Sequence, residues 1–391
     1  MASPGPTPQQ QTTTKAWTFR RRGPYRQTLS LTTSHPLPAF PPRLPKSGGA
    51  PSEEWLLLRV SHAALNPGDL VALSVMPFAI RTHRKTQPAA VPGMDLTASV
   101  VDVWRAAAAD DGHEQETRAA GRFARGDEVV CFPTLAHMLA TGAGGLQGVV
   151  ALPARYAVRI PRGRTKREAA GLLLAACTAD VQVADARVGR GQRVLVIGAS
   201  GGVGTMAVQM VRERVGKEGW VVAVCSGRNR GLVEGLGADE VIDYTQYPDL
   251  PGELAKRFAH QPFDNIIDTF GNQQVYKQCA RFLKPEGVYS ATSIHYDDYT
   301  FWQLLKSGLT ILSNTIWPKS TWLGGTGRTW KAASMMDPGL ETMERIVQMF
   351  GEGKLRVVVD SEWPFEKVHE ALDVLKSGHA AGKVIIKVNE D

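Results

Sequence analysis

The sequence predicts an α/β fold in which a mainly β region is followed by a doubly wound parallel sheet. Two patterns predict it. Residues 16 to about 174 contain short apolar runs broken by Pro and Gly, which is typical of β structure. From residue 193 onward, short β-branched runs alternate with helical patterns, as they do when helices cover both faces of a parallel sheet. With 391 residues, the chain is long enough for two domains.

The mainly β region is expected to begin after residue 14. The first 14 residues, rich in Pro, Gln and Thr, contain no basic residue and do not read as a signal or transit peptide, so we expect a disordered tail. The clearest strands after it are residues 55–60, 99–103 and 128–132. Residues 106–125 are mostly small or charged and are expected to form a loop inserted at a hairpin.

The doubly wound sheet is expected to contain six strands. They are residues 194–197, 221–224, 240–242, 265–268, 287–291 and 309–312. The first is short, uncharged and rich in β-branched residues, as a strand buried on both faces is. After Trp317 we expect a helix at 339–351, a strand at 356–359, a helix at 365–377 and a last strand at 383–388.

A glycine-dense turn follows the first of these strands and precedes a helical pattern. It contains Gly198, Gly201, Gly202 and Gly204. A helix N-terminus presents amide N–H groups and the positive end of the helix dipole, and glycines let a pyrophosphate approach the backbone. The glycine pattern alone leaves an ordinary turn open, but with a strand before it and a helix after it the turn predicts a dinucleotide site. The predicted residues are Gly201, Gly202, Val203 and Gly204.

The end of the second strand indicates which dinucleotide binds. An NAD site usually carries an acidic residue about 20 residues past the glycine turn, where it binds the ribose hydroxyls. Here no acidic residue occurs after the strand until Glu234. A hydroxyl and guanidinium groups suit a ribose 2′-phosphate, so Ser226, Arg228 and Arg230 predict NADPH. An ordinary solvated loop is the alternative for the two arginines.

Composition and charge exclude several classes of function. A chain with 43% hydrophobic and 21% charged residues is typical of a soluble globular protein, and no apolar run approaches the roughly 18 residues of a membrane helix. The net charge is +7, but the basic clusters lie in separate segments without interleaved aromatic residues. Solvated faces are therefore expected rather than a nucleic-acid site.

The cysteines predict neither disulfides nor a metal site. They are Cys131, Cys177, Cys225 and Cys279. They are widely spaced and form no C-x-x-C pair or cluster with histidine, so a reducing compartment and the absence of zinc are expected.

Several motifs together resemble the medium-chain dehydrogenase/reductase family, in its zinc-free quinone oxidoreductase-like branch. They are ALNPGD at 64–69, PGMD at 92–95, GDEV at 126–129, RYAVRIP at 155–161, GADEVIDY at 237–244, FDNIID at 263–268 and GKVI at 382–385. The resemblance extends from Lys15 over nearly the whole chain. It is greatest to the reticulon-interacting (NOGO-interacting) mitochondrial oxidoreductase group and its fungal relatives, while residues 309–339 diverge from that group.

The resemblance implies a Rossmann dinucleotide-binding domain at residues 176–317. Residues 15–175 and 318–391 would form a discontinuous, mainly β GroES-like catalytic domain, with the C-terminal part folding back onto the first. Zinc-containing members carry a cysteine where this chain has Asn66 and Pro67, so no metal is expected. NADPH bound at the switch point of the sheet would present its nicotinamide between the domains.

The resemblance also assigns individual residues. Ser226 and Tyr244 match positions that contact NADPH, and the alternative for Tyr244 is a cap at a strand end. Asn66 and Thr178 match catalytic positions beside the nicotinamide. Asp69 reads as a structural turn partner rather than as an acid. Two residues past Asp69, where many relatives carry a tyrosine as a proton donor, this chain has Val71, so no catalytic acid is assigned.

These observations favour an NADPH-dependent, zinc-independent oxidoreductase that transfers hydride to a quinone or an activated enone or enoyl double bond. Such substrates need no Lewis acid, because hydrogen-bond donors suffice to stabilise the enolate oxygen. The alternative is an NADPH-binding sensor or interaction protein with little turnover, since fold does not fix function. The expected partner is a small molecule, a homodimer is left open, and the expected location is cytoplasmic, with mitochondria as the location that the resemblance suggests.

Overall fold

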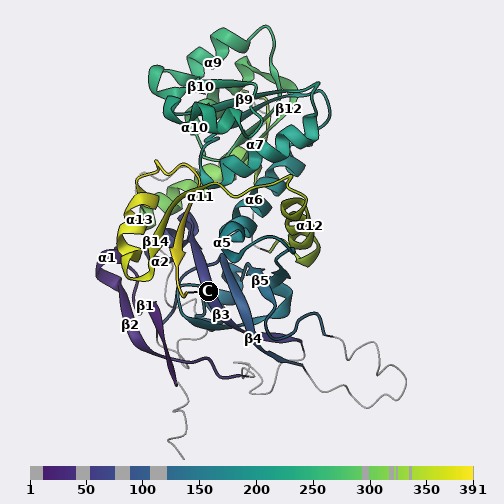
Figure 1. The fold of residues 1–391 in the computed structure, drawn as a ribbon. Coiled ribbons are helices and arrows are strands. Elements are labelled where there is room, and N and C mark those ends of the chain that lie inside the picture. Colours follow the sequence, from purple (N-terminus) through teal and green to yellow (C-terminus); the bar gives the residue numbers. More distant parts are fainter. Residues whose placement is uncertain are drawn as a thin grey trace, which may run out of the picture.

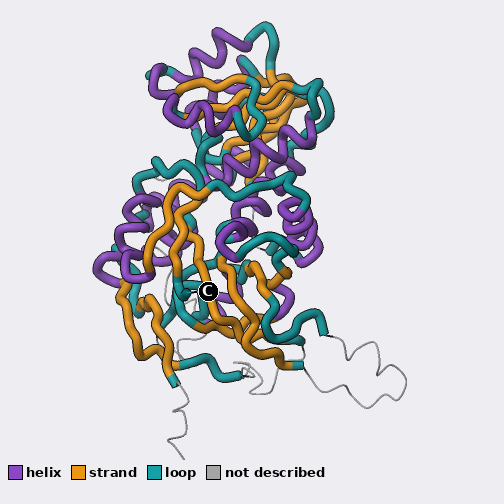
Figure 2. The backbone as a smooth tube through the Cα atoms, in the orientation of Figure 1, coloured by secondary structure: helices purple, strands orange, loops and turns teal. Residues whose placement is uncertain are grey.

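The computed structural model describes residues 12–40, 53–74, 89–105, 121–292, 299–316, 321–322, 325–333 and 337–390. The described strands form a six-stranded sheet, a seven-stranded sheet and a two-stranded sheet. Figure 1 shows the six-stranded sheet and its helices in the upper part of the molecule and the seven-stranded sheet in the lower part. Helices lie between the two larger groups of strands (Figure 2).

The six-stranded sheet is parallel throughout, with the order β10-β9-β8-β11-β12-β13. Its strands are β8 (Arg193–Ile197), β9 (Trp220–Cys225), β10 (Glu240–Asp243), β11 (Phe263–Asp268), β12 (Leu283–Ala291) and β13 (Thr329–Ala332). Numbered along the chain, this is the order 3-2-1-4-5-6 of a Rossmann sheet, which confirms the predicted doubly wound fold. Successive strands are added on one side of β8 as far as β10 and then on its other side from β11, and ligands bind at such a switch point.

The prediction of the sixth strand at residues 309–312 is wrong. These residues lie within the helix α11 (Phe301–Ile316), and β13 is the sixth strand. Apolar residues recur along α11 every three or four positions, which is the helical period, while the four-residue window alone reads as a strand. Ser307 and Asn314 are buried on the inner side of α11, and Asn314 pairs with Gln273.

Helices connect the strands of this sheet. They are α7 (Gly202–Val215), α8 (Arg230–Glu234), α9 (Leu250–Phe258) and α10 (Gln273–Gln278), with α11 before β13, while α6 (Leu172–Asp185) leads into the first strand, β8. The α7 helix carries apolar side chains on several sides, since it packs against both α6 and the sheet. The expected boundary at residue 317 does not match the sheet, because β13 follows it and still pairs with β12.

The seven-stranded sheet has the order β14-β15-β3-β4-β5-β7, with β6 paired to β3. Its strands are β3 (Trp55–Leu65), β4 (Leu96–Trp104), β5 (Glu128–Cys131), β6 (Val149–Pro153), β7 (Ala157–Arg159), β14 (Val359–Pro364) and β15 (Lys383–Lys387). The last strand, β15, pairs antiparallel with β3, so the C-terminal segment lies in the same sheet as the N-terminal strands (Figure 1). The exact domain boundaries remain a prediction.

Short helices border this sheet. They are α2 (Pro67–Ser74), α4 (Leu135–Thr141), α5 (Lys166–Ala169), α12 (Leu340–Gly351) and α13 (Val368–Lys376). The α12 helix matches the expected helix at 339–351, whereas α13 begins after a 3-10 turn at Phe365–Lys367. Most of the expected loop at 106–125 lies outside the described residues.

The N-terminal strand begins earlier than expected. β1 (Thr13–Phe19) pairs antiparallel with β2 (Leu29–Pro36), and the one-turn helix α1 (Tyr25–Thr28) lies between them. The expected tail therefore ran two residues too far, because Thr13 and Thr14 belong to a strand whose partner no local pattern reveals. The remainder of that tail, residues 1–11, lies outside the described residues.

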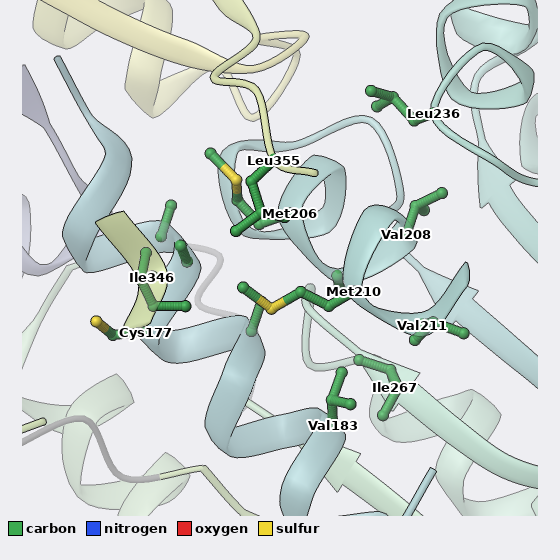
Figure 3. Close-up of a cluster of buried hydrophobic side chains, with 14 of the residues drawn as sticks. Cys177, Val183, Met206, Val208, Met210, Val211, Leu236, Ile267, Ile346 and Leu355 are labelled. Carbon is green, nitrogen blue, oxygen red and sulfur yellow. The ribbon is translucent and has the colours of Figure 1, made fainter. Parts of the chain in front are cut away.

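One hydrophobic cluster extends from one large sheet to the other. It includes Met94 and Phe132 beside the seven-stranded sheet and Val196 in β8. Figure 3 shows its centre, where Met206 and Met210 of α7 lie near Ile346 of α12. Because this cluster is shared, α6, α7 and α12 join the two parts of the molecule through a common core.

Candidate active site

The glycine turn between β8 and α7 has the geometry of a phosphate-binding turn. Gly198 has φ of +73°, a left-handed conformation that favours glycine. A Cβ on Gly204 would lie 2.0 Å from the carbonyl oxygen of Gly198, so only glycine permits this close approach. Gly201 is the N-cap of α7, and no described side chain caps the helix there. The first N–H groups of a four-turn helix therefore lack a side-chain acceptor.

Val203 contributes differently from the glycines beside it. Its side chain is partly buried and packs against the shared hydrophobic cluster. Only its backbone N–H, at the first turn of α7, is available to a ligand. The turn as a whole therefore suits a pyrophosphate held by main-chain groups.

Three polar side chains meet where β8 and β9 end. The Asn229 Nδ2 group donates to Ser200 Oγ at 3.0 Å and to Ser226 Oγ at 3.3 Å. Both serine oxygens act as acceptors here, which leaves each hydroxyl hydrogen free to point toward an anion. Ser226 was predicted, whereas Ser200 and Asn229 were not. Their position immediately after two neighbouring strands was the signal that identifies them.

The predicted arginines differ in their contacts. Arg228 donates from Nη2 to the carbonyl oxygen of His379 at 2.8 Å, which links this loop to the C-terminal segment. Arg230 is half-exposed and lies 3.4 Å from Glu234 on the next turn of α8. An exposed ion pair of this kind contributes little stability, so another anion can readily replace Glu234 as the partner of Arg230.

A carboxylate from the third strand also reaches this loop. Asp243, the last residue of β10, accepts hydrogen bonds from Thr245, and the backbone N–H of Gly227 contributes to lowering the pKa of its carboxyl. No local pattern pointed to this acid, because it follows a different strand, β10. Tyr244 comes next and is 42% exposed, so its ring is available to a ligand at this edge.

Asn66 directly follows β3, and both the oxygen and the nitrogen of its side-chain amide form hydrogen bonds. Its Oδ1 accepts from Lys383 Nζ at 2.6 Å, and its Nδ2 donates to the carbonyl oxygen of Ala64 at 3.1 Å. Lys383 Nζ also lies 3.4 Å from Asp95 Oδ2, and both of these charged side chains are almost fully buried. Burial raises the pKa of the Asp95 carboxyl, and the Lys383 ammonium opposes that shift.

Asp69 holds the turn that contains Asn66. Its carboxylate accepts from the backbone N–H of Asn66 at 2.9 Å and from that of Gly93 at 3.2 Å. The side chain is 1% exposed, and burial raises the pKa of its carboxyl to about 6. These contacts support the structural role predicted for Asp69.

Thr178 lies in the middle of α6 and is almost buried. Its hydroxyl donates to the carbonyl oxygen of Leu174 at 2.7 Å, one turn earlier in the helix. The single hydroxyl hydrogen is thereby used, so Thr178 offers a ligand only an acceptor. An amide N–H of a ligand would satisfy that acceptor.

Lys383 brings the catalytic and cofactor candidates together. A Cβ on Gly202 would lie 2.9 Å from Lys383 Cδ, so the lysine side chain runs beside the glycine turn. Gly382 forms a parallel bridge with Gly201. Asn66 and the glycine turn therefore share one neighbour. The GKVI motif contributed to the resemblance, but the motif did not mark its lysine as part of the site.

The thiols are buried in this structure. All four cysteines are buried and unbridged, and burial raises the pKa of Cys225 to about 11. Among the residues described, no three His, Cys, Asp or Glu side chains are grouped as metal ligands would be. No described helix is both long and apolar enough to cross a bilayer.

Known proteins resemble this chain along most of its length. Residues 236–386 match a family described as zinc-binding dehydrogenase. Medium chain reductase pydE of Acremonium sp is 31% identical, over 96% of this chain and 99% of that protein. Trans-enoyl reductase poxH of Penicillium oxalicum is 28% identical, over 97% and 99%. The mitochondrial NAD(P)H oxidoreductase RTN4IP1 of Bos taurus is 34% identical, over 58% and 57%.

A solved structure with the same fold is the quinone oxidoreductase from Coxiella burnetii. It has a TM-score of 0.70 at 21% identity and covers 96% of this chain and 100% of its own. The fold implies a nicotinamide cofactor, and the glycine turn, with its close backbone approach at Gly204, fits one. The relationship to the curated reductases confirms the resemblance drawn from the motifs. The chain therefore belongs to the medium-chain dehydrogenase/reductase family and is an oxidoreductase.

Proposed function

We propose that the protein is an NADPH-dependent, zinc-independent reductase of quinones or of activated enone and enoyl double bonds. The observation that carries the cofactor choice is the group formed by Ser200, Ser226 and Asn229, with Arg228 and Arg230 in the same loop. Two hydroxyl hydrogens and two guanidinium groups suit a phosphate dianion.

The acid nearest this loop does not argue for NADH. Asp243 directs its carboxylate to Thr245 and to the backbone of its own turn. A carboxylate whose lone pairs are engaged in this way is a poor acceptor for ribose hydroxyls. The two serine hydroxyls are therefore the groups that we expect at the ribose.

The proposed chemistry uses few side chains. Bound NADPH would supply a hydride, and reduction of a conjugated system places negative charge on its oxygen. The second N–H of Asn66, which faces the Asp95 carboxyl, would be shared with that oxygen or with the carboxamide of the cofactor. Thr178 would accept from an amide N–H. No Lewis acid is required for such substrates, and Asn66 and Pro67 stand where zinc enzymes of the family carry a cysteine.

The name of one relative, trans-enoyl reductase, supports the double bond as substrate, and the name of the structural neighbour supports the quinone. The direct test is to follow NADPH oxidation with 9,10-phenanthrenequinone and with a series of enones. Turnover with NADPH that exceeds turnover with NADH would support the proposal. Tight NADPH binding without turnover on any of these compounds would favour a cofactor-binding sensor instead.

A further inference from the structure

We propose that Lys383 is a positioning residue that orients and polarises the amide of Asn66, an inference that rests on the proposed reductase function. Lys383 is the first residue of β15 and is only 3% exposed. Its ammonium group lies 2.6 Å from Asn66 Oδ1, which is a short charge-assisted hydrogen bond.

Two neighbours determine which way the Asn66 amide points. An ammonium group contains only donors, so the atom opposite Lys383 Nζ must be the amide oxygen. The carbonyl of Ala64 only accepts, so the atom 3.1 Å from it must be Nδ2. Both requirements give the same orientation. The second N–H of the Asn66 amide faces the buried Asp95 carboxyl, whose pKa this hydrogen bond lowers. A ligand oxygen would share that donor with Asp95, so the side chain meets a ligand as a donor.

The same contact makes that donor stronger. A cation bonded to the amide oxygen draws electron density away from the amide nitrogen, and successive hydrogen bonds polarise one another. A donor aimed at an oxygen that becomes negative contributes mainly in the transition state. Lys383 would thus raise turnover through Asn66 without contacting the substrate.

Buried neighbours hold Lys383 in place. A Cβ on Gly171 would lie 2.8 Å from its Cε, and one on Gly202 would lie 2.9 Å from its Cδ, so both glycines leave room for the lysine stem. Asp95, which is fully buried 3.4 Å away, supplies the counter-charge that a buried ammonium needs. The backbone N–H of Lys383 donates to the Val358 carbonyl at 2.8 Å.

The variant that tests this role is Lys383→Met combined with Asp95→Asn. Replacing both partners leaves no unpaired buried charge, whereas Lys383→Met alone would leave the carboxylate uncompensated. We expect the double variant to lose about tenfold or more in kcat, since one donor loses its orientation and its polarisation. The KM for the quinone and the Kd for NADPH should change by less than about twofold.

The matched control is Lys166→Met. Lys166 is also a buried lysine, with 8% exposure, and its Nζ lies 2.8 Å from Glu128 Oε1. It borders the same sheet, where its Nζ contacts Ser99 and Glu128 rather than Asn66. This variant should keep the kcat of the wild-type protein.

A double-mutant cycle with Asn66→Ala tests whether Lys383 acts through Asn66 or independently of it. In the wild-type background, Asn66→Ala should lower kcat about 10²-fold, and in the background without the charged pair by only about tenfold or less. Losses that multiply would overturn the proposal. Equal weakening of NADPH and NADH binding would also overturn it, because Lys383 would then act as a cofactor ligand.

A spectroscopic measurement tests the contact without turnover. In protein labelled with ¹⁵N-asparagine, the side-chain amide signal of Asn66 is assigned by its loss in Asn66→Ala. It should shift in the Lys383→Met/Asp95→Asn variant and stay in place in Lys166→Met. An unchanged signal in the first variant contradicts the positioning role. If the wild-type protein reduces no quinone or enone, the proposed function fails while this measurement still decides the contact.

Discussion

The guanidinium of Arg228 donates a 2.8 Å hydrogen bond to the carbonyl oxygen of His379, although 151 residues separate them in the sequence. The loop after β9 is thereby attached to the turn that precedes β15. A ligand phosphate that recruits Arg228 must share the guanidinium with this carbonyl or replace it. A guanidinium has five N–H donors, so Arg228 can bind a phosphate and the His379 carbonyl at the same time.

Removing either arginine should reduce the preference for NADPH. Loss of one charge-assisted bond to phosphate costs about 1.5–3 kcal/mol, so Arg228→Ala or Arg230→Ala should weaken NADPH binding tenfold or more and leave NADH binding almost unchanged. Fluorescence titration measures both affinities. Arg190→Ala, which removes an exposed arginine paired with Glu218, is the control. Equal affinity of the unmodified protein for both cofactors would contradict the NADPH proposal.

The amide of Asn66 should matter for turnover rather than for cofactor binding. We expect Asn66→Ala to lower the turnover number with an activated quinone or enone about 10²-fold, the scale of losing one oxyanion donor, with NADPH affinity barely changed. If Asn66 only shapes the turn before Pro67, the variant should instead lose thermal stability and keep its activity. A stable variant with full turnover would remove Asn66 from the site.

A methyl group at Gly204 should disrupt the glycine turn. Its Cβ would lie 2.0 Å from the Gly198 carbonyl oxygen, a backbone atom that has to move. Gly204→Ala should therefore destabilise the protein by about 1–3 kcal/mol and abolish tight cofactor binding. Gly231→Ala is the matched control, since no described atom lies within 4 Å of its Cβ. Calorimetry with and without NADPH separates the two effects, and a Gly204 variant with wild-type affinity would refute the close approach.

Acid should destabilise the fold through His137. This side chain of α4 packs against the rings of Trp55 and Tyr156, and its Nε2 has no hydrogen-bond partner among the described residues. Burial, with a smaller effect of Arg155, lowers the pKa of His137 from 6.5 to about 4. Between these values the unfolded chain binds a proton and the folded one does not, so stability falls as pH falls through that window.

The size of the effect is on the order of 3 kcal/mol, and His137→Phe should remove it. Asp69 acts in the opposite direction, because its carboxyl has a pKa raised to about 6 and takes up a proton more readily in the folded protein. The contribution of Asp69 is the same in the wild-type protein and in His137→Phe, so it cancels when their unfolding free energies are subtracted. The measurement is the difference in unfolding free energy between variant and wild type from pH 7 to pH 4. A difference independent of pH would contradict the assignment.

Zinc should play no part in activity. The purified protein is expected to contain no stoichiometric zinc and to keep its turnover in a chelator, because Asn66 and Pro67 occupy the place of a ligand cysteine in zinc-containing relatives. Elemental analysis that finds one tightly bound zinc per chain would overturn the proposed mechanism.

Local patterns predicted the elements whose surroundings are uniform. β8 was predicted almost to the residue, because a strand buried on both faces is apolar throughout and glycines mark its end. The window 309–312 misled because four apolar residues are compatible with either a strand or a helix. The start of β1 was missed for another reason, since its strand character comes from a partner that lies at Leu29–Pro36.

Local patterns likewise predicted some residues of the candidate site and not others. The glycine turn and Ser226 follow directly from a strand end, where position along the chain implies position in space. Asn229 and Ser200 come together only because β8 and β9 are neighbours. The contact of Lys383 with Asn66 spans 317 residues and depends on the return of β15 to β3, which no local pattern specifies.

That return has a consequence for the order in which the protein matures during synthesis. The six-stranded sheet ends at Ala332, so all of its strands have been translated 51 residues (383 − 332) before Lys383. A nascent chain therefore contains the glycine turn before the lysine beside it has been synthesised, and the contact between Lys383 and Asn66 forms only after all six strands of that sheet have been made.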